Sequence, residues 1–400
     1  MRLLHVIQSA DPRHGGPIEA LTARAGLLGR LGHRVEVASC DDPGADFVRD
    51  ATLPIHALGP GLGKYGWTPR LLAWLRAHHR GYDAVIVNGV WQYNGLAVRQ
   101  ALADSGRRYF LFPHGMLDPW FGERYPIKHL KKLPYWLLVE RFNLLRAAAV
   151  LFTSEEERQR ARRAFPCYAA AREEIAPYGV AAPEKPLDDY RRAFAAVLPA
   201  LANTRYLIFM GRLHEKKGVD LLLDAFASVA AGHPDVSLLI AGPDDTPYAD
   251  LLKKRAQRLG MAARVTWAGM LSGDVKYGAL VAAEAFVLPS HQENFGVAVV
   301  EALACGTPVL ISDKVNIWRE VEAGGAAYVE ADTVEGTRRL LDRWLALPAP
   351  DRAAMAAAAQ PLFRERFDIA SSLDRFLDIV GGNVGGDVGG NVGPSRVEAV

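Results

Sequence analysis

Short apolar runs alternate with amphipathic stretches along almost the whole of this sequence. Such alternation is typical of repeated βα units, whose strands form a parallel sheet that is buried on both faces. The first half predicts strands at 2–7, 34–39, 83–88, 108–113 and 148–153, with a helix beginning at Pro17. The second half predicts strands at 205–213, 236–244, 264–269, 284–290 and 307–312. The pattern therefore predicts an α/β protein with two doubly wound parallel sheets.

Two domains are also expected because 400 residues are too many for a single hydrophobic core. The Pro-rich, polar segment 176–190 is typical of a linker, so we expect domains at 1–180 and 181–365. Residues 366–380 have the apolar spacing of an amphipathic helix. The Gly-rich repeat in 381–400 cannot form a core, and we expect it to be disordered.

The bulk composition excludes several classes of protein. A formal net charge of +2 gives no general case for nucleic-acid binding. The three cysteines are far apart, which argues for a reducing compartment and against a disulfide framework. No apolar run approaches the roughly 18 residues of a membrane span, and the first residues do not have the pattern of a signal peptide. We expect a cytoplasmic protein whose membrane contact, if any, is peripheral.

Two features follow predicted strands of the first domain, where ligands of such sheets bind. Gly15 and Gly16 precede the helix at Pro17, whose free amides could hold an anion, although a tight turn explains the glycines equally well. The pair belongs to neither a GxGxxG fingerprint nor a Walker A loop. His114 ends the fourth strand at a glycine turn, where a functional role and an ordinary surface histidine both remain open.

Three cations follow the first strand of the second domain, in the stretch GRLHEKKG before an amphipathic helix. Arg212, Lys216 and Lys217 converge there on one loop at a helix N-terminus. A compact polyanion such as a diphosphate is the natural partner of that arrangement. The alternative is a solvated basic turn.

The stretch HQENFGVAVVEALACGTPVLIS carries two glutamates in apolar surroundings. Glu293 lies in the loop before a helix, and Glu301 lies about two turns further along. A carboxylate at that place can accept hydrogen bonds from sugar hydroxyls, while the amides of Asn294, Phe295 and Gly296 hold a phosphate. Glu301 would be costly to bury without a hydroxyl or a cationic partner.

These residues give the sequence a clear resemblance over about residues 1–380. It resembles the retaining glycosyltransferases of family 4, through the Glu–seven residues–Glu signature with NFG and through GRLHEKKG followed by DLLLDAF. The resemblance implies a GT-B fold, in which two Rossmann-like domains face each other across a cleft and a C-terminal crossover helix, here 366–380, returns to the first domain.

The resemblance also implies roles for the donor-binding residues. Arg212 and Lys217 would bind the diphosphate of a nucleotide sugar and stabilise the leaving nucleotide. Glu293 would bind hydroxyls of the donor sugar, and Glu301 the ribose. The backbone amides near the helix entry would support phosphate and sugar, namely those of Asn294, Phe295 and Gly296.

The remaining roles are implied for residues nearer the acceptor and the base. His114 would reach the donor sugar near its reacting centre, with Gly15 and Gly16 beside the phosphate and the acceptor. The backbone at Met270 and Leu271 would contact the base. One departure concerns Tyr178, in PYGVAA, which takes the place of the asparagine in the NGVD of many family members.

The implied reaction transfers a hexose from a nucleotide diphosphate sugar to a hydroxyl of a glycan or lipid-linked oligosaccharide, with retention, in surface polysaccharide synthesis. GDP-mannose is favoured slightly over a UDP-hexose. The sequence contains no D-x-D pair, so we expect no metal and no other cofactor. The alternatives are a sugar-nucleotide 2-epimerase of the same architecture and a non-catalytic sugar-nucleotide-binding partner.

Residues 119–146 interleave basic and aromatic side chains. Such a segment can rest on an anionic membrane, and it can equally be a basic surface helix beside the cleft. We favour the membrane, on the inner face of the plasma membrane, because lipid-linked sugars are frequent acceptors in the family.

Overall fold

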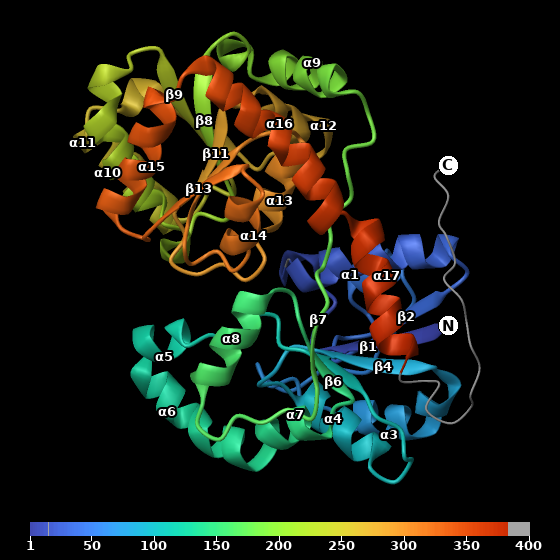
Figure 1. The fold of residues 1–400 in the computed structure, drawn as a ribbon. Helices are drawn as coiled ribbons and strands as arrows, with labels where there is room; N and C mark the ends of the chain where they lie inside the picture. The colour runs from blue at the N-terminus through green and yellow to red at the C-terminus, as the bar shows by residue number, and fades with distance from the viewer. Residues whose placement is uncertain (15, 383–400) are drawn as a thin grey trace.

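The computed structural model describes residues 1–14 and 16–382, which form two α/β domains (Figure 1). The first domain contains a sheet of seven parallel strands in the order β3-β2-β1-β4-β5-β6-β7. Its strands are β1 Arg2–Ile7, β2 Arg34–Ser39, β3 Ile55–Ala57, β4 Ala84–Asn88, β5 Phe110–Phe112, β6 Ala149–Phe152 and β7 Glu173–Ile175. Its helices are α1 Gly16–Arg30, α2 Asp46–Arg49, α3 Pro69–His78, α4 Tyr93–Leu102, α5 Trp120–Arg124, α6 Pro126–Tyr135, α7 Arg141–Arg146 and α8 Glu155–Ala164.

The second domain contains a sheet of six parallel strands in the order β10-β9-β8-β11-β12-β13. Its strands are β8 Arg205–Met210, β9 Val236–Ala241, β10 Val265–Gly269, β11 Ala285–Leu288, β12 Val309–Ser312 and β13 Ala327–Glu330. The helices after β7 are α9 Leu187–Val197, α10 Val219–Val229, α11 Pro247–Arg258, α12 Gly273–Ala282, α13 Val297–Ala304, α14 Trp318–Ala323, α15 Val334–Ala346, α16 Ala349–Arg366 and α17 Ile369–Gly381.

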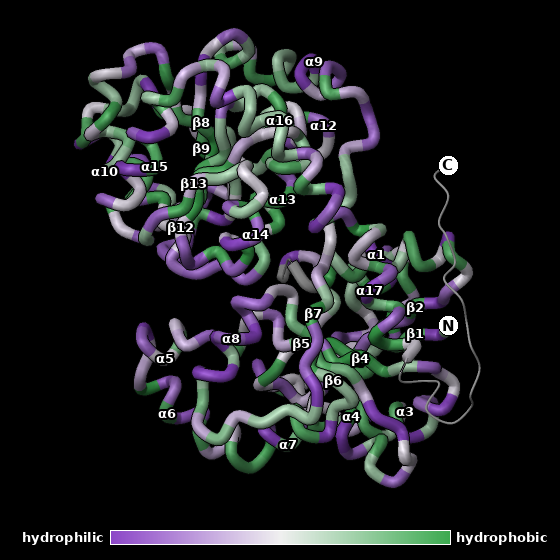
Figure 2. The backbone as a smooth tube through the Cα atoms, viewed as in Figure 1, coloured by the Kyte–Doolittle hydropathy of each residue, from purple (hydrophilic) through white to green (hydrophobic). Residues whose placement is uncertain are grey.

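The strands of the first sheet are apolar on both faces, as the sequence pattern requires. In β1, Leu4 and Val6 belong to one hydrophobic cluster, while Leu3 and Ile7 belong to another. Successive side chains of a strand point to opposite faces, so helices must cover both sides. Figure 2 shows apolar residues concentrated along the central strands of both domains.

The structure confirms the predicted fold class of two doubly wound parallel sheets. Each of the ten predicted strands overlaps an observed one, but β3, β7 and β13 were missed. All three lie at the edge of a sheet and are half-buried along most of their length. An edge strand needs only a short apolar run, which is why these strands lack the signal that identifies the central ones.

The chain passes between the domains twice, and the two crossings are joined by backbone hydrogen bonds. The amide of Val180 donates to the carbonyl of Phe367 at 2.8 Å, and the amide of Ile369 donates to that of Val180 at 3.0 Å. After the second crossing, α17 packs Leu373 and Phe376 into the core of the first domain. Figure 1 shows α16 on the second domain and α17 beside α1.

Two further expectations concern the end of the chain and the membrane. Helix α17 runs to Gly381, and the segment 383–400, expected to be disordered, lies outside the described residues. Within residues 1–14 and 16–382, no helix is both long and apolar enough to cross a membrane.

Candidate active site

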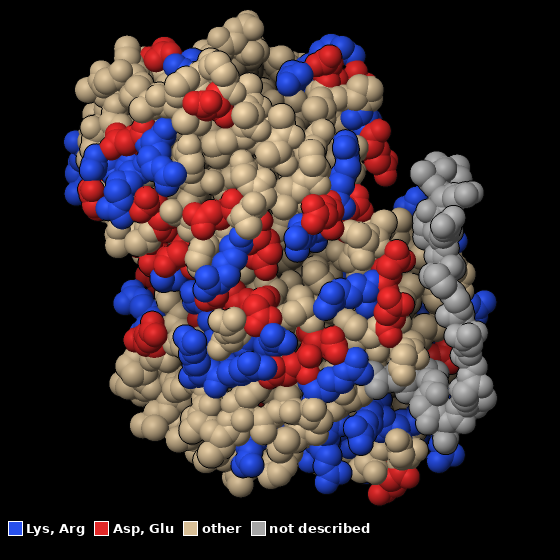
Figure 3. Space-filling model, in the orientation of Figure 1, with Lys and Arg blue, Asp and Glu red and all other residues tan. Residues whose placement is uncertain are grey.

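The carboxyl ends of strands from both sheets meet where the domains touch. The Asn294 side chain, after β11, donates to Thr153 Oγ1, after β6, at 3.2 Å. Gln292 Nε2 lies 3.4 Å from Asp118 Oδ2 of the first domain. Figure 3 shows charged side chains of both signs gathered across this junction on one face of the molecule. Ligands of doubly wound sheets bind at such strand ends.

The loop after β8 is shaped by backbone contacts with the loop after β11. Gly218, at the N-cap of α10, has φ 67°, and a Cβ there would lie 2.1 Å from the carbonyl oxygen of Pro289. Only glycine fits both conditions. The amide of His291 and the hydroxyl of Ser290 donate to the carbonyl of Lys216 at 2.8 and 2.9 Å. These contacts hold the loop against the next strand end.

Arg212, Lys216 and Lys217, here called the β8-loop cations, carry more positive charge than their surroundings neutralise. Lys217 Nζ donates to the Glu293 carboxylate, whereas Arg212 is exposed and forms no ion pair within residues 1–14 and 16–382. Burial, together with Lys216 and Arg212, lowers the pKa of Lys217 to about 7. Burial and Arg212 lower the pKa of Lys216 to about 8, against the opposing effect of Asp118. An anion bound here would relieve this repulsion.

The loop after β11 leads into α13 with its N-terminus open to a ligand. Gly296 has φ 72° at the N-cap, and no side chain among the described residues caps the helix. The first amides of α13 are therefore available to an anion, as the helix dipole favours. The backbone of Glu293 is tied to the loop after β12, because its amide donates to the Lys314 carbonyl and its carbonyl accepts from the Asn316 amide, each at 3.0 Å. The Phe295 side chain is buried and packs edge-on against Phe367.

Glu301 lies on α13 with its carboxylate mostly buried, and a lysine compensates it. Lys276 Nζ of α12 donates to Glu301 Oε1 at 2.7 Å. This is the kind of cationic partner that burial of the carboxylate requires. Sequence reasoning missed Lys276, because nothing in its position 25 residues upstream of Glu301 indicates the contact.

The residues expected near the base follow β10. Met270 is 68% exposed and Leu271 is half-buried. Strand β10 is separated from β8 by β9, so these two residues lie on the same edge of the sheet as the β8-loop cations but two strands away.

His114 has a left-handed backbone and an imidazole that faces its own domain. Its φ is 54°, which is uncommon for a residue with a side chain. Its Nε2 lies 3.1 Å from Asn88 Oδ1, and the Tyr178 hydroxyl contacts its Nδ1. Burial, His5 and Arg24 lower the pKa of His114 to about 3, so the ring is neutral at physiological pH. Both ring nitrogens have partners within the protein.

The turn after His114 is held by a buried carboxylate that sequence reasoning missed. Glu157 accepts from the Gly115 amide at 2.6 Å and from the amide and the hydroxyl of Thr153, each at 2.7 Å. A Cβ on Gly115 would lie 2.8 Å from the Asn294 side chain. Glycine thus allows the two domains to approach closely.

Of the N-terminal glycine pair, Gly16 is the first residue of α1, and Gly15 lies outside the described residues.

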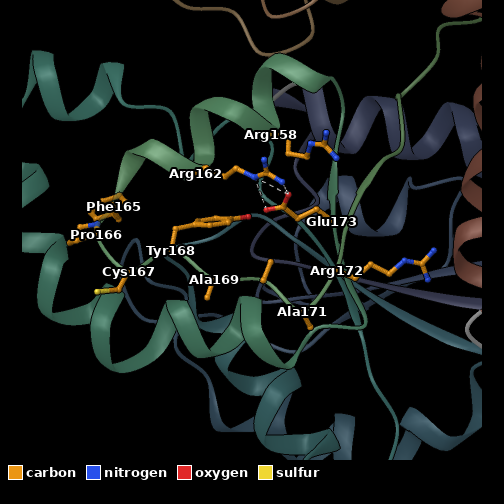
Figure 4. A pocket seen from close by; sticks show the side chains of 11 residues that line it. Arg158, Arg162, Phe165, Pro166, Cys167, Tyr168, Ala169, Ala171, Arg172 and Glu173 are labelled. Atoms are coloured by element: carbon orange, nitrogen blue, oxygen red, sulfur yellow. Dashed lines mark hydrogen bonds and ion pairs between the residues drawn. The ribbon is translucent and has the colours of Figure 1, made fainter.

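A separate hollow of about 810 Å³ lies between α8 and the segment 165–173 (Figure 4). Three arginines border it, Arg158, Arg162 and Arg172, here called the α8-hollow arginines. Each has a carboxylate partner: Glu155 at 2.6 Å, Glu173 at 3.0 Å and Glu174 at 2.7 Å, respectively. None of the predicted site residues borders this hollow.

Within the described parts of the chain, no three His, Cys, Asp or Glu residues are grouped as metal ligands.

Comparison with solved structures identifies the class of fold. Sucrose-phosphate synthase from Thermosynechococcus elongatus superposes with a TM-score of 0.76 at 19% identity, covering 97% of this chain and all of the other. Anabaena HepE in complex with UDP and glucose superposes with a TM-score of 0.75 at 20% identity, covering 96% of this chain and all of the other. At these identities the likeness shows the fold alone, which is GT-B.

Comparison of the sequence then shows the family. Residues 191–361 match the family model for glycosyl transferases group 1, and residues 15–179 match that for the glycosyl transferase 4-like domain. The chain belongs to the group 1 glycosyltransferases, and the resemblance inferred from the motifs is confirmed.

Two curated relatives show how far the likeness extends. The chain is 32% identical over 209 residues to D-inositol 3-phosphate glycosyltransferase of Rhodococcus opacus, covering 50% of this chain and 46% of the relative. It is 34% identical over 187 residues to phosphatidyl-myo-inositol mannosyltransferase of Mycobacterium tuberculosis, covering 44% of this chain and 48% of the relative. The chain thus spans about half the length of the curated relatives it matches.

Proposed function

We propose that this glycosyltransferase moves a hexose from a nucleotide diphosphate sugar to a hydroxyl of a glycan or lipid-linked oligosaccharide, with retention of configuration. The observation that carries the proposal is the positive charge of the β8-loop cations, which the carboxylate of Glu293 neutralises only in part. Lys216 and Lys217 directly precede the N-terminus of α10, and Lys217 contacts Glu293. This arrangement suits a diphosphate followed by a sugar.

Each residue then has a distinct task. Arg212 and Lys217 bind the diphosphate and stabilise its charge as the bond to the sugar breaks. Glu293 accepts hydrogen bonds from sugar hydroxyls, and Glu301 accepts from the ribose. The open amides at the start of α13 bind the phosphate nearest the sugar.

The chemistry follows a front-face course. The bond between C1 and the phosphate oxygen breaks, and the acceptor oxygen forms its bond to C1 on the same face. The departing phosphate takes the acceptor proton. As the family resemblance implies, Glu293 faces the sugar hydroxyls and not the attacked side of C1, so it serves as a hydroxyl acceptor and not as a nucleophile. Catalysis then rests on positioning and charge stabilisation. Because the β8-loop cations supply the positive charge, the reaction needs no divalent metal.

The relatives support a hexose donor. HepE is described with UDP and glucose, and the mycobacterial relative is named as a mannosyltransferase. We favour GDP-mannose over a UDP-hexose as donor and surface polysaccharide as the product's destination.

A peripheral contact with an anionic membrane belongs to the same proposal. Ile127, Leu130 and Leu138, in and just after α6, are 72%, 68% and 73% exposed. Lys128 and Lys131 lie between and beside them in the sequence. Apolar side chains interleaved with cations match a membrane surface with acidic headgroups. We place the enzyme at the inner face of the plasma membrane, where this segment would meet a lipid-linked acceptor.

Calorimetric titration with UDP, GDP, ADP and dTDP, without metal, tests the donor site. Selective binding of one nucleotide is expected, and it would identify the base. If a folded sample binds none of them, the diphosphate role of the β8-loop cations is wrong. Release of the nucleotide from its sugar only when an acceptor is present then separates a transferase from an epimerase and from a non-catalytic binder.

A further inference from the structure

Tyr178 lies in the first crossing between the domains, and its ring contacts both halves of the candidate site. On the first domain it stacks on His114 with ring centroids 5.3 Å apart and on Phe112 at 5.8 Å. On the second domain it meets Phe295 edge-on at 5.9 Å. Phe295 directly follows Glu293 and Asn294 in the loop before α13. One side chain therefore joins the His114 turn to the entry of α13.

The hydrogen bonds around His114 define its tautomer. The Asn88 nitrogen lies 3.3 Å from the carbonyl of Ile86, which can only accept, so the Asn88 oxygen faces His114 Nε2 at 3.1 Å. Nε2 must therefore carry the hydrogen. Nδ1 is left as an acceptor, and the Tyr178 hydroxyl, which also lies 3.2 Å from Nε2, donates to it. The hydroxyl thus favours one tautomer and one orientation of the ring.

The backbone on either side of Tyr178 is held as firmly as the ring. Arg24 Nη2 donates to the carbonyls of Pro177 and Tyr178 at 2.8 and 3.0 Å. A Cβ on Gly179 would lie 2.5 Å from Ile369 Cα, so the two crossings are in close contact at this point. Tyr178 cannot shift alone, because its position is set jointly by α1 and the second crossing.

We infer that Tyr178 is a positioning residue for sugar transfer, which fixes the Nε2–H tautomer of His114 and holds the His114 turn against the entry of α13. His114 has a left-handed backbone conformation that surrounding contacts must maintain. The Tyr178 hydroxyl supplies one of these contacts, to Nδ1 of the imidazole. The catalytic consequence rests on the proposed function, whereas the tautomer of His114 does not.

The variant Tyr178→Phe tests this inference, because it keeps the ring and removes the hydroxyl. Nitrogen-15 NMR of labelled histidine, with the His114 signal assigned by its loss in His114→Gln, reports the tautomer directly. The parent should show a single Nε2–H form. In Tyr178→Phe only the contact with Asn88 still favours that form, so a mixture of tautomers should appear. Transfer should slow about tenfold in kcat, with donor KM changed less than about twofold, since the loss is one of alignment.

Tyr190→Phe is the matched control. Its hydroxyl accepts from the Lys185 amide at 3.1 Å, also close to the crossing, but it does not contact His114. This variant should leave both the His114 signal and kcat unchanged. An unchanged His114 spectrum in Tyr178→Phe would overturn the inference, whatever the activity. If the parent transfers no sugar from any donor, the proposed function fails, while the spectrum still decides whether Tyr178 positions His114.

Discussion

Two groups of three cations in this molecule differ in how the protein neutralises them. Each of the α8-hollow arginines contacts a carboxylate of its own. Of the β8-loop cations, Lys217 contacts a carboxylate, that of Glu293, and both lysines have lowered pKa values. Paired charges on a surface contribute little and need no further partner. Unneutralised cations that are partly buried cost free energy, and an anionic ligand offsets that cost.

Among the β8-loop cations, the strongest loss of activity is expected from Lys217→Ala. Removal of the cation nearest Glu293 takes away stabilisation of the departing diphosphate, and kcat should fall about 10²- to 10³-fold. Circular dichroism and a thermal melt should show an intact fold, because backbone contacts of Lys216 with Ser290 and His291 hold this segment in place. Turnover close to that of the parent would contradict the proposed role.

A smaller and more selective effect is expected from Glu293→Gln. Loss of a charged acceptor for sugar hydroxyls should weaken productive use of the nucleotide sugar about 10- to 100-fold. Binding of the free nucleotide diphosphate should stay the same or improve, because Lys217 loses its competing partner. Calorimetry with the nucleotide and kinetics with its sugar give the two values. Equal losses in both would exclude a sugar contact.

Proton uptake on nucleotide binding measures how far the pKa values of Lys216 and Lys217 are lowered in the free protein. In the free protein the pKa values of Lys217 and Lys216 are lowered to about 7 and about 8, so at pH 8 both lysines are partly deprotonated. A bound diphosphate raises both values, so at pH 8 binding should take up about one proton, and affinity should weaken as the pH rises above about 7. Titration at pH 8 in buffers of different ionisation enthalpy measures the uptake. The Lys217→Ala protein should take up less, and an identical value would mean that Lys217 does not titrate on binding.

The smallest effect is expected in the α8 hollow. Arg162→Ala removes a half-exposed ion pair with Glu173, and the free energy of unfolding should change by less than about 1 kcal/mol. Nucleotide binding should not change. A marked loss of nucleotide affinity would contradict the distinction between the two groups of cations, because it would assign a ligand to arginines that already have carboxylate partners.

The central strands and the edge strands show what a local pattern can predict. Strands such as β4 and β6 are buried at every position, and their apolar runs identify them. Strand β7, with the sequence EEI, is half-buried throughout and was missed. Its place in the sheet comes from pairing with β6, which a local sequence pattern does not contain.

In the candidate site too, some features could be predicted from local motifs, and others depend on contacts between distant elements. The motifs located the β8-loop cations and the two glutamates of the α13 region, and the family comparison confirms the class to which those motifs point. They did not reveal that Lys276 compensates Glu301, or that Glu157 supports the turn at Gly115. These partners come from other elements, at separations that no motif records.

The class of fold, the order of the central strands along the chain and the family could all be predicted from the sequence. Apolar periodicity and short motifs are local properties, and local properties can be read from neighbouring residues. Which charges are neutralised, how His114 is oriented and the contact of Tyr178 with both domains became visible only in the folded structure. Those outcomes depend on side chains brought together from distant parts of the chain, and their energies arise only when the two sheets are packed and facing each other.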